Sequence, residues 1–351
     1  MTRLEKNIAA AFLLLCATAH CVLSIFYTNQ SFINLRDYAE GREKLPFQGR
    51  MLMSFLLGGT EHNHMLLSVA ARFTHHVAMP EPFTVYKLVS LIAALLATAA
   101  LGVALSAASR RLNIRPWWLP WSLLLLILYV SYAARYEQNL WYPYDLPHMA
   151  VFGLAAIFLF IDEPLWFVLA AALDCSIRET ALFVIVLAVV MRFRQRSWWL
   201  ATGAGTLAWI ASRIAVHHLY PHNPVILDPR PEQVRYLLPW HWPQLLSIVG
   251  FLPIPVLLSR RFLPPMHRRA LYAATALMIS TFYFAVWAET RAWLEWSTAF
   301  AIWASMILVD RERRIVGHIP GTRSEAVCEE NGWRVSAVDR VGENDGVVRS
   351  R

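Results

Sequence analysis

The chain has 351 residues, of which 57% are hydrophobic and only 16% are charged, and its mean hydropathy is +0.41. Soluble domains usually contain about 45–50% apolar and about 25% charged residues, so this composition excludes a large water-soluble catalytic domain. It predicts an all-α, polytopic membrane protein, because each span takes roughly 20 apolar residues. Basic residues outnumber acidic ones by 32 to 24 and are nearly all Arg. This excess fits membrane lipids better than nucleic acid, since no basic run combines with an aromatic platform.

The apolar stretches, taken in chain order, predict about eight spans. The first, at about 8–27, follows Arg3 and Lys6 and is longer than the apolar core of most signal peptides, so we expect a retained helix. Residues 28–83 form a polar outer loop whose apolar pieces are too short to span a membrane. The other predicted spans lie at about 84–107, 117–133, 146–161, 197–216, 245–259, 270–287 and 292–309.

The last part of the chain differs in composition from the rest. Residues 310–351 have balanced charge, several glycines and few aromatic residues. Such a composition cannot bury a core, so it predicts a disordered cytoplasmic tail after a membrane domain that covers residues 1–309.

Residues 164–191 are long enough for one span but carry Asp174, Arg178 and Glu179 near the middle. Charges at the centre of a span are costly. A hairpin of two short helices that turns at about 174–180 would instead put all five arginine clusters on one side, as the positive-inside rule expects. We therefore predict a hairpin with an extracytoplasmic turn and with both termini in the cytoplasm. The clusters lie near the N-terminus and at 110–115, 192–196, 260–269 and 311–314.

With this topology, the acidic and unusual polar residues gather on the outer face. Asp145 and His148, three residues apart at a helix entry, share one face and could bind a substrate or a metal ion together. An alternative is a helix-start acid favoured by the helix dipole, next to an interfacial histidine. Metal dependence stays open, with a divalent cation as the candidate cofactor. The histidine pairs elsewhere lack the spacing of a known metal site with an acidic partner.

Two charged pairs have the i, i+4 spacing of a helical ion pair. Asp174 and Arg178 could steady the hairpin turn, while Arg178 and Glu179 together are candidates for a site. In the second pair, Arg291 is a candidate anion binder and Glu295 is expected to be structural.

The arrangement of these elements resembles the GT-C superfamily of membrane glycosyltransferases. The shared features are an N-terminal helix, a long outer first loop with an acid, the Tyr144-Asp145 element at a later helix start, and the apolar hairpin LAAALDCSIRETALF with a charged outer turn. Members of the superfamily often have a Thr-Lys-Gly-Pro-like turn in the hairpin, where this chain has Ser176-Ile-Arg178-Glu179-Thr180. The resemblance covers about residues 1–309 and is one of architecture.

The resemblance implies transfer of a sugar from a polyprenyl-phosphate donor to an envelope glycan, lipid or protein at the outer face of the inner membrane. In that reaction a carboxylate takes the proton of the acceptor hydroxyl, and positive charge holds the departing phosphate. The implied base is Asp37 in the first outer loop, with Glu40 as its substitute. Arginine suits phosphate because its guanidinium binds two oxygens at once. The substrate-binding candidates are Arg50, Tyr144, Asp145, His148, Arg178, Glu179 and Arg291.

Two other classes of protein fit the same sequence. A transporter or flippase of lipid-linked sugars could use Arg178 and Glu179 as a charge pair along its pathway. A non-catalytic subunit of an envelope assembly would depend on no single carboxylate.

Overall fold

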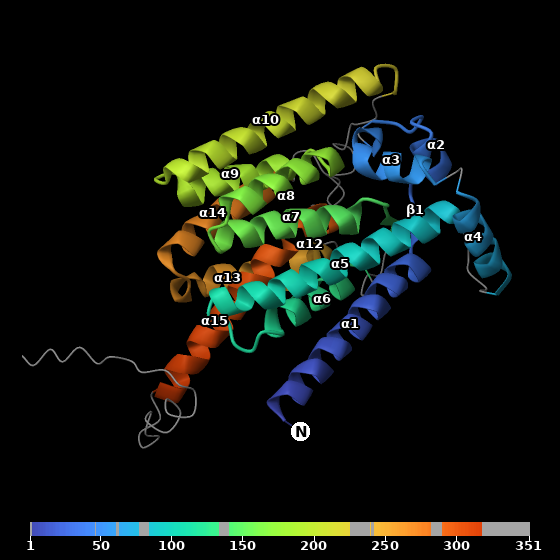
Figure 1. Ribbon diagram of the computed structural model, residues 1–351. Coiled ribbons are helices and arrows are strands. Elements are labelled where there is room, and N and C mark those ends of the chain that lie inside the picture. The colour runs from blue at the N-terminus through green and yellow to red at the C-terminus, as the bar shows by residue number, and fades with distance from the viewer. Residues whose placement is uncertain are drawn as a thin grey trace, which may run out of the picture. The chain divides into compact units, whose positions relative to one another are not determined.

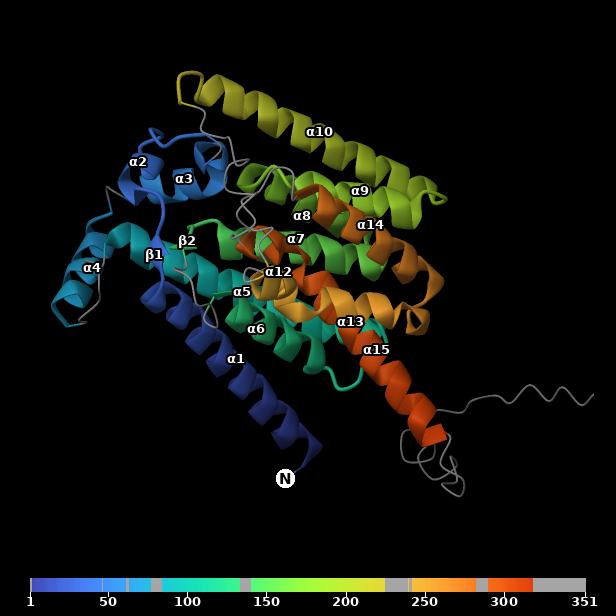
Figure 2. The ribbon, with the colours of Figure 1, turned by 180° about the vertical axis from the view of Figure 1, so that it is seen from behind.

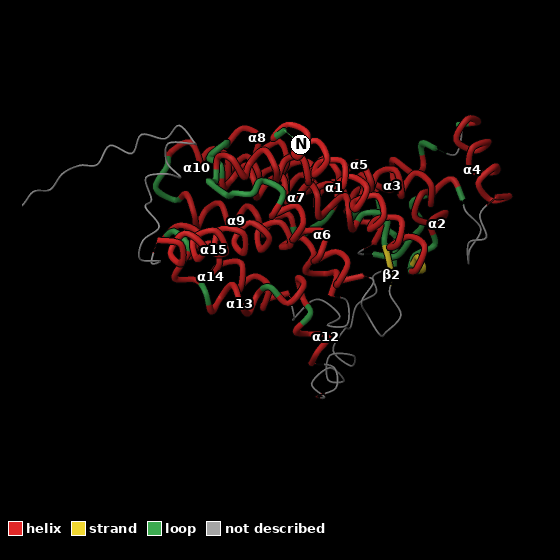
Figure 3. The backbone as a smooth tube through the Cα atoms, turned by 90° about the horizontal axis from the view of Figure 1, so that it is seen from below, coloured by secondary structure: helices red, strands yellow, loops and turns green. Residues whose placement is uncertain are grey.

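A computed structural model describes residues 2–45, 47–60, 63–76, 84–132, 140–224, 239, 242–281 and 290–317. The described backbone is mostly helical, as Figure 3 shows, which confirms the predicted all-α class. The chain divides into two units, Met1–Val309 and Asp310–Arg351. Most of the predicted tail, residues 318–351, lies outside the described residues.

Among the described residues, two helices are long and apolar enough to cross a membrane: α1 (Arg3–Thr28) and α5 (Val85–Arg111). Helix α1 begins with a capping box, in which the Thr2 hydroxyl accepts from the Glu5 amide and the Glu5 carboxylate accepts from the Thr2 amide. Such reciprocal bonds satisfy amides that a helix start leaves free. Both helices agree with predicted spans, and they pack against each other (Figure 1).

In its described residues, the polar segment between α1 and α5 forms short helices, as its broken apolar pieces predicted. These are α2 (Leu35–Ala39), η1 (Phe47–Gly49), α3 (Met51–Gly58) and α4 (His64–His76). The strand β1 (Gln30–Ser31) pairs in parallel with β2 (Leu140–Trp141). This pairing ties the start of the loop to the segment that leads into the helix after β2.

The hairpin predicted at 164–191 is present. Helix α8 (Pro164–Ile177) ends at Arg178, whose φ of −153° is extended, and α9 (Ala181–Arg192) begins after Thr180. The break is shorter than predicted, since Asp174 and Cys175 still belong to the last turn of α8 and are buried. The hairpin packs against α7 (Asp145–Phe160) and α10 (Arg196–Leu219), while α6 (Leu119–Tyr132) packs against α1 and α5.

The span predicted at 245–259 is not a continuous helix. It consists of η3 (Ile248–Phe251) and α13 (Pro253–Leu258), and it follows the short α12 (Trp242–Leu246). Val249 and Gly250 have left-handed φ values of 51° and 63°, which interrupt the helical path. Prolines at 253 and 255 remove amide donors, so this apolar segment lacks the bonds that a long helix needs.

The remaining elements run from η4 (Arg260–Phe262) through α14 (Pro265–Thr281) and η5 (Thr290–Trp296) to α15 (Ser297–Gly317). Figure 2 shows α13, α14 and α15 on the side turned away in Figure 1. The predicted spans at 270–287 and 292–309 overlap α14 and α15, although residues 282–289 lie outside the described part.

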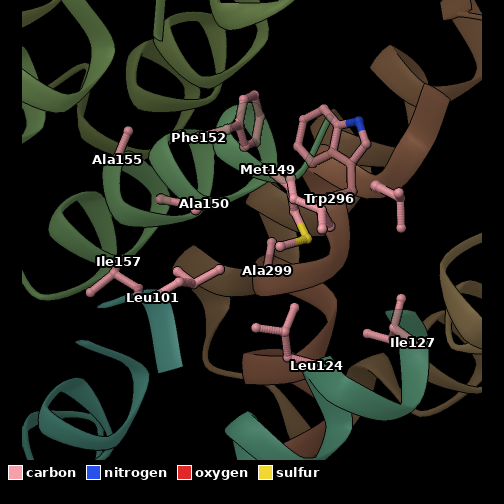
Figure 4. Close-up of a cluster of buried hydrophobic side chains, with 14 of the residues drawn as sticks. Leu101, Leu124, Ile127, Met149, Ala150, Phe152, Ala155, Ile157, Trp296 and Ala299 are labelled. Carbon is pink, nitrogen blue, oxygen red and sulfur yellow. The ribbon is translucent and has the colours of Figure 1, made fainter. Parts of the chain in front are cut away.

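Helix α7 lies at the centre of the first unit, in contact with α5, α8, α9 and η5. Figure 4 shows its buried side chains Met149 and Phe152 near Trp296, with Leu101 of α5 and Leu124 of α6 below them. Phe152 packs edge-on against Trp296 at 5.3 Å between ring centroids. This core fixes the first turn of α7 against η5.

The helix ends opposite the 178–180 turn carry many of the basic residues. Arg111 at the end of α5 pairs with Glu163 at 2.5 Å, and Arg192 at the end of α9 pairs with Asp162 at 3.3 Å. Arginines from two of the predicted clusters therefore pair with acids in the loop that connects α7 and α8.

Candidate functional site

The candidate site is formed where three distant stretches of the chain meet: Arg50 before α3, Tyr144 before α7, and the 178–180 turn. Tyr38 of α2 helps to fix Arg50, because its hydroxyl donates to the Arg50 carbonyl at 2.5 Å. The Arg50 side chain then reaches back toward Tyr144 and Glu179. We call Arg50, Tyr144, Arg178, Glu179 and Arg213 the arginine cluster.

Arg50 is buried, with 6% of its surface exposed, and it lies on an aromatic face. Its Cζ is 4.1 Å from the centroid of the Tyr144 ring. Burial lowers the pKa of Arg50, but negative charge on neighbours that include Glu179 and Asp145 raises it by more, so the guanidinium stays charged. A buried positive charge stacked on an aromatic ring is a strong cation–π contact.

Glu179 carries the negative charge of the cluster. Its carboxylate is 3.4 Å from Arg50 Nη2 and 4.0 Å from Arg213 Nη1, and about a third of its side chain is exposed. Burial raises the pKa of Glu179, but Arg50 and Arg178 lower it by more, to about 2. The carboxylate is therefore ionised at neutral pH and balances only part of the positive charge around it.

Several donors of the cluster have no hydrogen-bond partner among the described residues: Arg50 Nε, Arg178 Nε and the Tyr144 hydroxyl, all of them buried atoms. Buried polar groups in native proteins are nearly always hydrogen-bonded. These three donors, beside one long ion pair, could bind a ligand with several acceptor oxygens.

Asp145 and His148 lie near this cluster, but they have separate partners. Asp145 accepts from the Tyr132 hydroxyl at 3.2 Å and from the Tyr142 amide at 3.3 Å. His148 points instead toward Asp174, with Nδ1 2.7 Å from Oδ1. Asp145 and His148 therefore contact different residues, and their joint binding of a substrate stays a prediction.

His148 belongs to a second group, the buried bridge, which consists of His148, Asp174, Glu295 and Thr180. His148 Nε2 lies 2.8 Å from Glu295 Oε2, and the Thr180 hydroxyl donates to the same oxygen at 2.5 Å. His148, Asp174 and Glu295 are 0–1% exposed. The expected pair of Asp174 with Arg178 is replaced by the histidine, because the extended backbone at Arg178 leaves the helix face.

Sequence reasoning missed the bridge and Arg213. Asp174, Glu295 and His148 are far apart in the chain, and only the packing of α7, α8 and η5 brings them together. Arg213 was hidden inside an apolar span, yet its Nη2 donates to the Cys175 carbonyl at 3.0 Å. A charge within such a span was the available signal.

The two acids of the first outer loop pair with arginines of the same loop. Asp37 on α2 is 39% exposed and pairs with Arg42 at 3.0 Å, while Glu40 pairs with Arg36 at 2.9 Å and also with Arg42. Asp37 adjoins Tyr38, which packs beside Tyr144 at 6.1 Å between rings. The side chain of Arg291 lies outside the described residues.

In the described ranges, no group of three or more His, Cys, Asp or Glu residues is arranged to hold a metal ion. Both nitrogens of His148 face carboxylates, which leaves neither free as a ligand. A hollow of about 490 Å³ lies at the other end of α9, and five residues line it: Val189, Val190, Phe193, Arg194 and Arg269.

Comparison with protein-family models, curated proteins and solved structures finds no match to the chain.

Proposed function

We propose that the chain is a GT-C-type integral membrane glycosyltransferase that uses a polyprenyl-phosphate sugar donor. The observation that carries the proposal is the arginine cluster, in which Arg50 Nε and two further buried donors lack acceptors among the described residues. A phosphate offers several charged oxygens, and arginine binds such groups in pairs of hydrogen bonds. The ring of Tyr144 supports the guanidinium of Arg50 from behind.

The location in the inner membrane rests on the surfaces of the helices. Helix α10 exposes Leu200, Leu207, Ile210 and Ile214, and α1 exposes Phe12 among others. A stripe of apolar side chains suits lipid rather than water. The basic helix ends opposite the arginine cluster fit the cytoplasmic side, so the cluster would face outward, with both termini inside.

The reaction would be an inverting transfer. The acceptor hydroxyl oxygen attacks the anomeric carbon, and the bond from that carbon to the phosphate oxygen breaks with its electron pair. Asp37, with Glu40 as its substitute, takes the hydroxyl proton. Arg50, Arg178 and Arg291 hold the polyprenyl phosphate that leaves, and the acceptor is an envelope glycan, lipid or protein.

A transporter of lipid-linked sugars is the second candidate, and one observation favours it. The chain has a second interrupted helix at Val249–Gly250, besides the break at 178–180. Transporters often build their sites from pairs of broken helices. A transporter would move the lipid-linked sugar without breaking its bond to phosphate.

The test is incorporation of labelled sugar from a polyprenyl-phosphate donor into an extracytoplasmic glycan, by purified protein in liposomes. Asp37→Asn should reduce turnover by about 10²–10⁴ without affecting expression, as expected for loss of a positioned base. Near wild-type incorporation by Asp37→Asn and by the double variant with Glu40→Gln would reject these residues as the base. Movement of intact donor across the bilayer without transfer would favour the transporter.

A further inference from the structure

The buried bridge holds both ends of the turn that carries Arg178 and Glu179. Asp174 lies in the last turn of α8, and Thr180 is the residue that precedes α9. Each is tied to a different element: Asp174 to His148 on α7, and Thr180 to Glu295 on η5. The short backbone between Asp174 and Thr180 is thus fixed at two points.

The net charge of the bridge also affects Arg178. Each of the two contacts between His148 and a carboxylate holds one proton, which can sit on either partner. Two carboxylates and an imidazole that share these two protons have a net charge of −1. Arg178 interacts electrostatically with Asp174. A buried charge is stable only when it is paired and hydrogen-bonded. The bridge therefore attracts the guanidinium of Arg178 as well as fixing its backbone.

We propose that His148 is a positioning residue, whose bridge to Asp174 and Glu295 holds the 178–180 turn so that Glu179 faces Arg50. The inference concerns the anion site of the proposed function and rests on it. His148 does not touch the ligand in this arrangement, because both of its ring nitrogens are already bonded. Its effect reaches the site through Asp174 and Thr180.

Cys175 gives a direct readout of the turn. It is fully buried next to Asp174, and its carbonyl accepts from Ser212 at 2.9 Å. With Cys16, Cys21 and Cys328 replaced by Ala, it is the only thiol left in the chain. The rate at which N-ethylmaleimide labels it then reports how often the end of α8 opens.

The chain offers matched controls for the substitutions. His148→Gln is compared with His267→Gln, a second buried histidine that accepts from Trp303 at 3.2 Å. Thr180→Val is compared with Thr18→Val, which removes the acceptor of Trp121. Thr180→Ser keeps the hydroxyl and should behave as wild type.

We expect His148→Gln and Thr180→Val to raise the Cys175 labelling rate about tenfold, since a broken buried hydrogen bond shifts a local opening by about that factor. The two control variants should leave the Cys175 labelling rate unchanged, even where they lower the melting temperature as much as the bridge variants do. Equal labelling in bridge and control variants would overturn the proposal, as would unchanged labelling in both bridge variants.

The consequence for the site is measured with farnesyl phosphate as the probe. Asp174→Asn should weaken its binding about tenfold, because a weaker contact with His148 no longer holds the 178–180 turn in place, whereas Asp162→Asn at the other end of α8 should not. Unchanged affinity in Asp174→Asn would overturn the link to the site. If wild-type protein binds no farnesyl phosphate while labelling follows the bridge, the proposed function fails and the bridge stands.

Discussion

Arg50 and Tyr144, 94 positions apart in the sequence, form one stacked unit, with the guanidinium carbon 4.1 Å from the ring centroid. Arg50 Nη2 lies 3.4 Å from Glu179 Oε1, and Arg50 Nε has no hydrogen-bond partner in the described part of the chain. Lysine cannot reproduce this geometry, because an ammonium is a point charge with no fork of donors.

The first prediction is that Arg50→Lys weakens farnesyl phosphate binding roughly tenfold while the protein still folds, since it keeps the charge but loses paired hydrogen bonds and stacking. Isothermal calorimetry in detergent measures the affinity. Arg111→Lys, at an exposed arginine paired with Glu163, is the control and should bind as wild type. Equal affinities for both variants would remove Arg50 from the proposed site.

The second prediction concerns topology. Reporter fusions after Arg115, Arg196 and Arg269 should read as cytoplasmic, because the arginine clusters are expected on that side. A fusion at about residue 225 should read as outside, together with the loop 28–83. A cytoplasmic signal at residue 225 would contradict the arrangement of the spans.

Much of the helical pattern could be predicted from the sequence because apolar length and charge determine it locally. The break after α8 followed from the charges at Arg178 and Glu179, which a continuous apolar helix would not carry at its middle. The interruption at Val249 and Gly250 could not be predicted in the same way. That segment carries no charge, and Gly250 lies so close to α6 that an added Cβ would be 3.0 Å from Ile127.

The site residues also differ in whether a local sequence pattern could predict them. Tyr144, Arg178 and Glu179 were candidates because polar groups at helix ends of an apolar chain are unusual. Glu295 was expected to be structural, and its contacts with His148 and Thr180 do join three elements. Which histidine meets which acid depends on how α7, α8 and η5 pack, and no local pattern encodes that.

The third prediction tests the contact of α5 with α6. A Cβ at Gly102 would overlap the buried ring of Trp121, whose Nε1 donates to Thr18 and so cannot move freely. Gly102→Ala should therefore lower the free energy of unfolding by about 1–3 kcal/mol, as overpacking does. Thermal unfolding in detergent measures the change.

Gly203→Ala is the matched control for that substitution. It lies within helix α10 with nothing within 4 Å of the added carbon. Alanine there should stabilise the helix by up to about 1 kcal/mol, because glycine is the poorer helix former. If Gly102→Ala were as stable as Gly203→Ala, the packing of Trp121 against α5 would be wrong.

The fourth prediction concerns pH and Glu179. Although burial raises the pKa of Glu179, Arg50 and Arg178 lower it further, from the usual 4.5 to about 2. A carboxyl whose pKa is lower in the folded state adds stability above the unfolded pKa and loses it as pH falls through the folded pKa. Its contribution should thus be complete above about pH 5 and should disappear between about pH 4.5 and 2.

The measurement compares the melting temperatures of wild-type protein and Glu179→Gln in detergent from pH 7 to pH 2. The difference should stay constant down to about pH 5 and then shrink, because protonated Glu179 resembles glutamine in charge. Glu163→Gln removes the exposed pair with Arg111 and should change the melting temperature little, since surface ion pairs contribute little. A difference that already closes between pH 7 and pH 5 would mean that the arginines do not hold Glu179 ionised, and the charge balance assigned to the arginine cluster would then be incorrect.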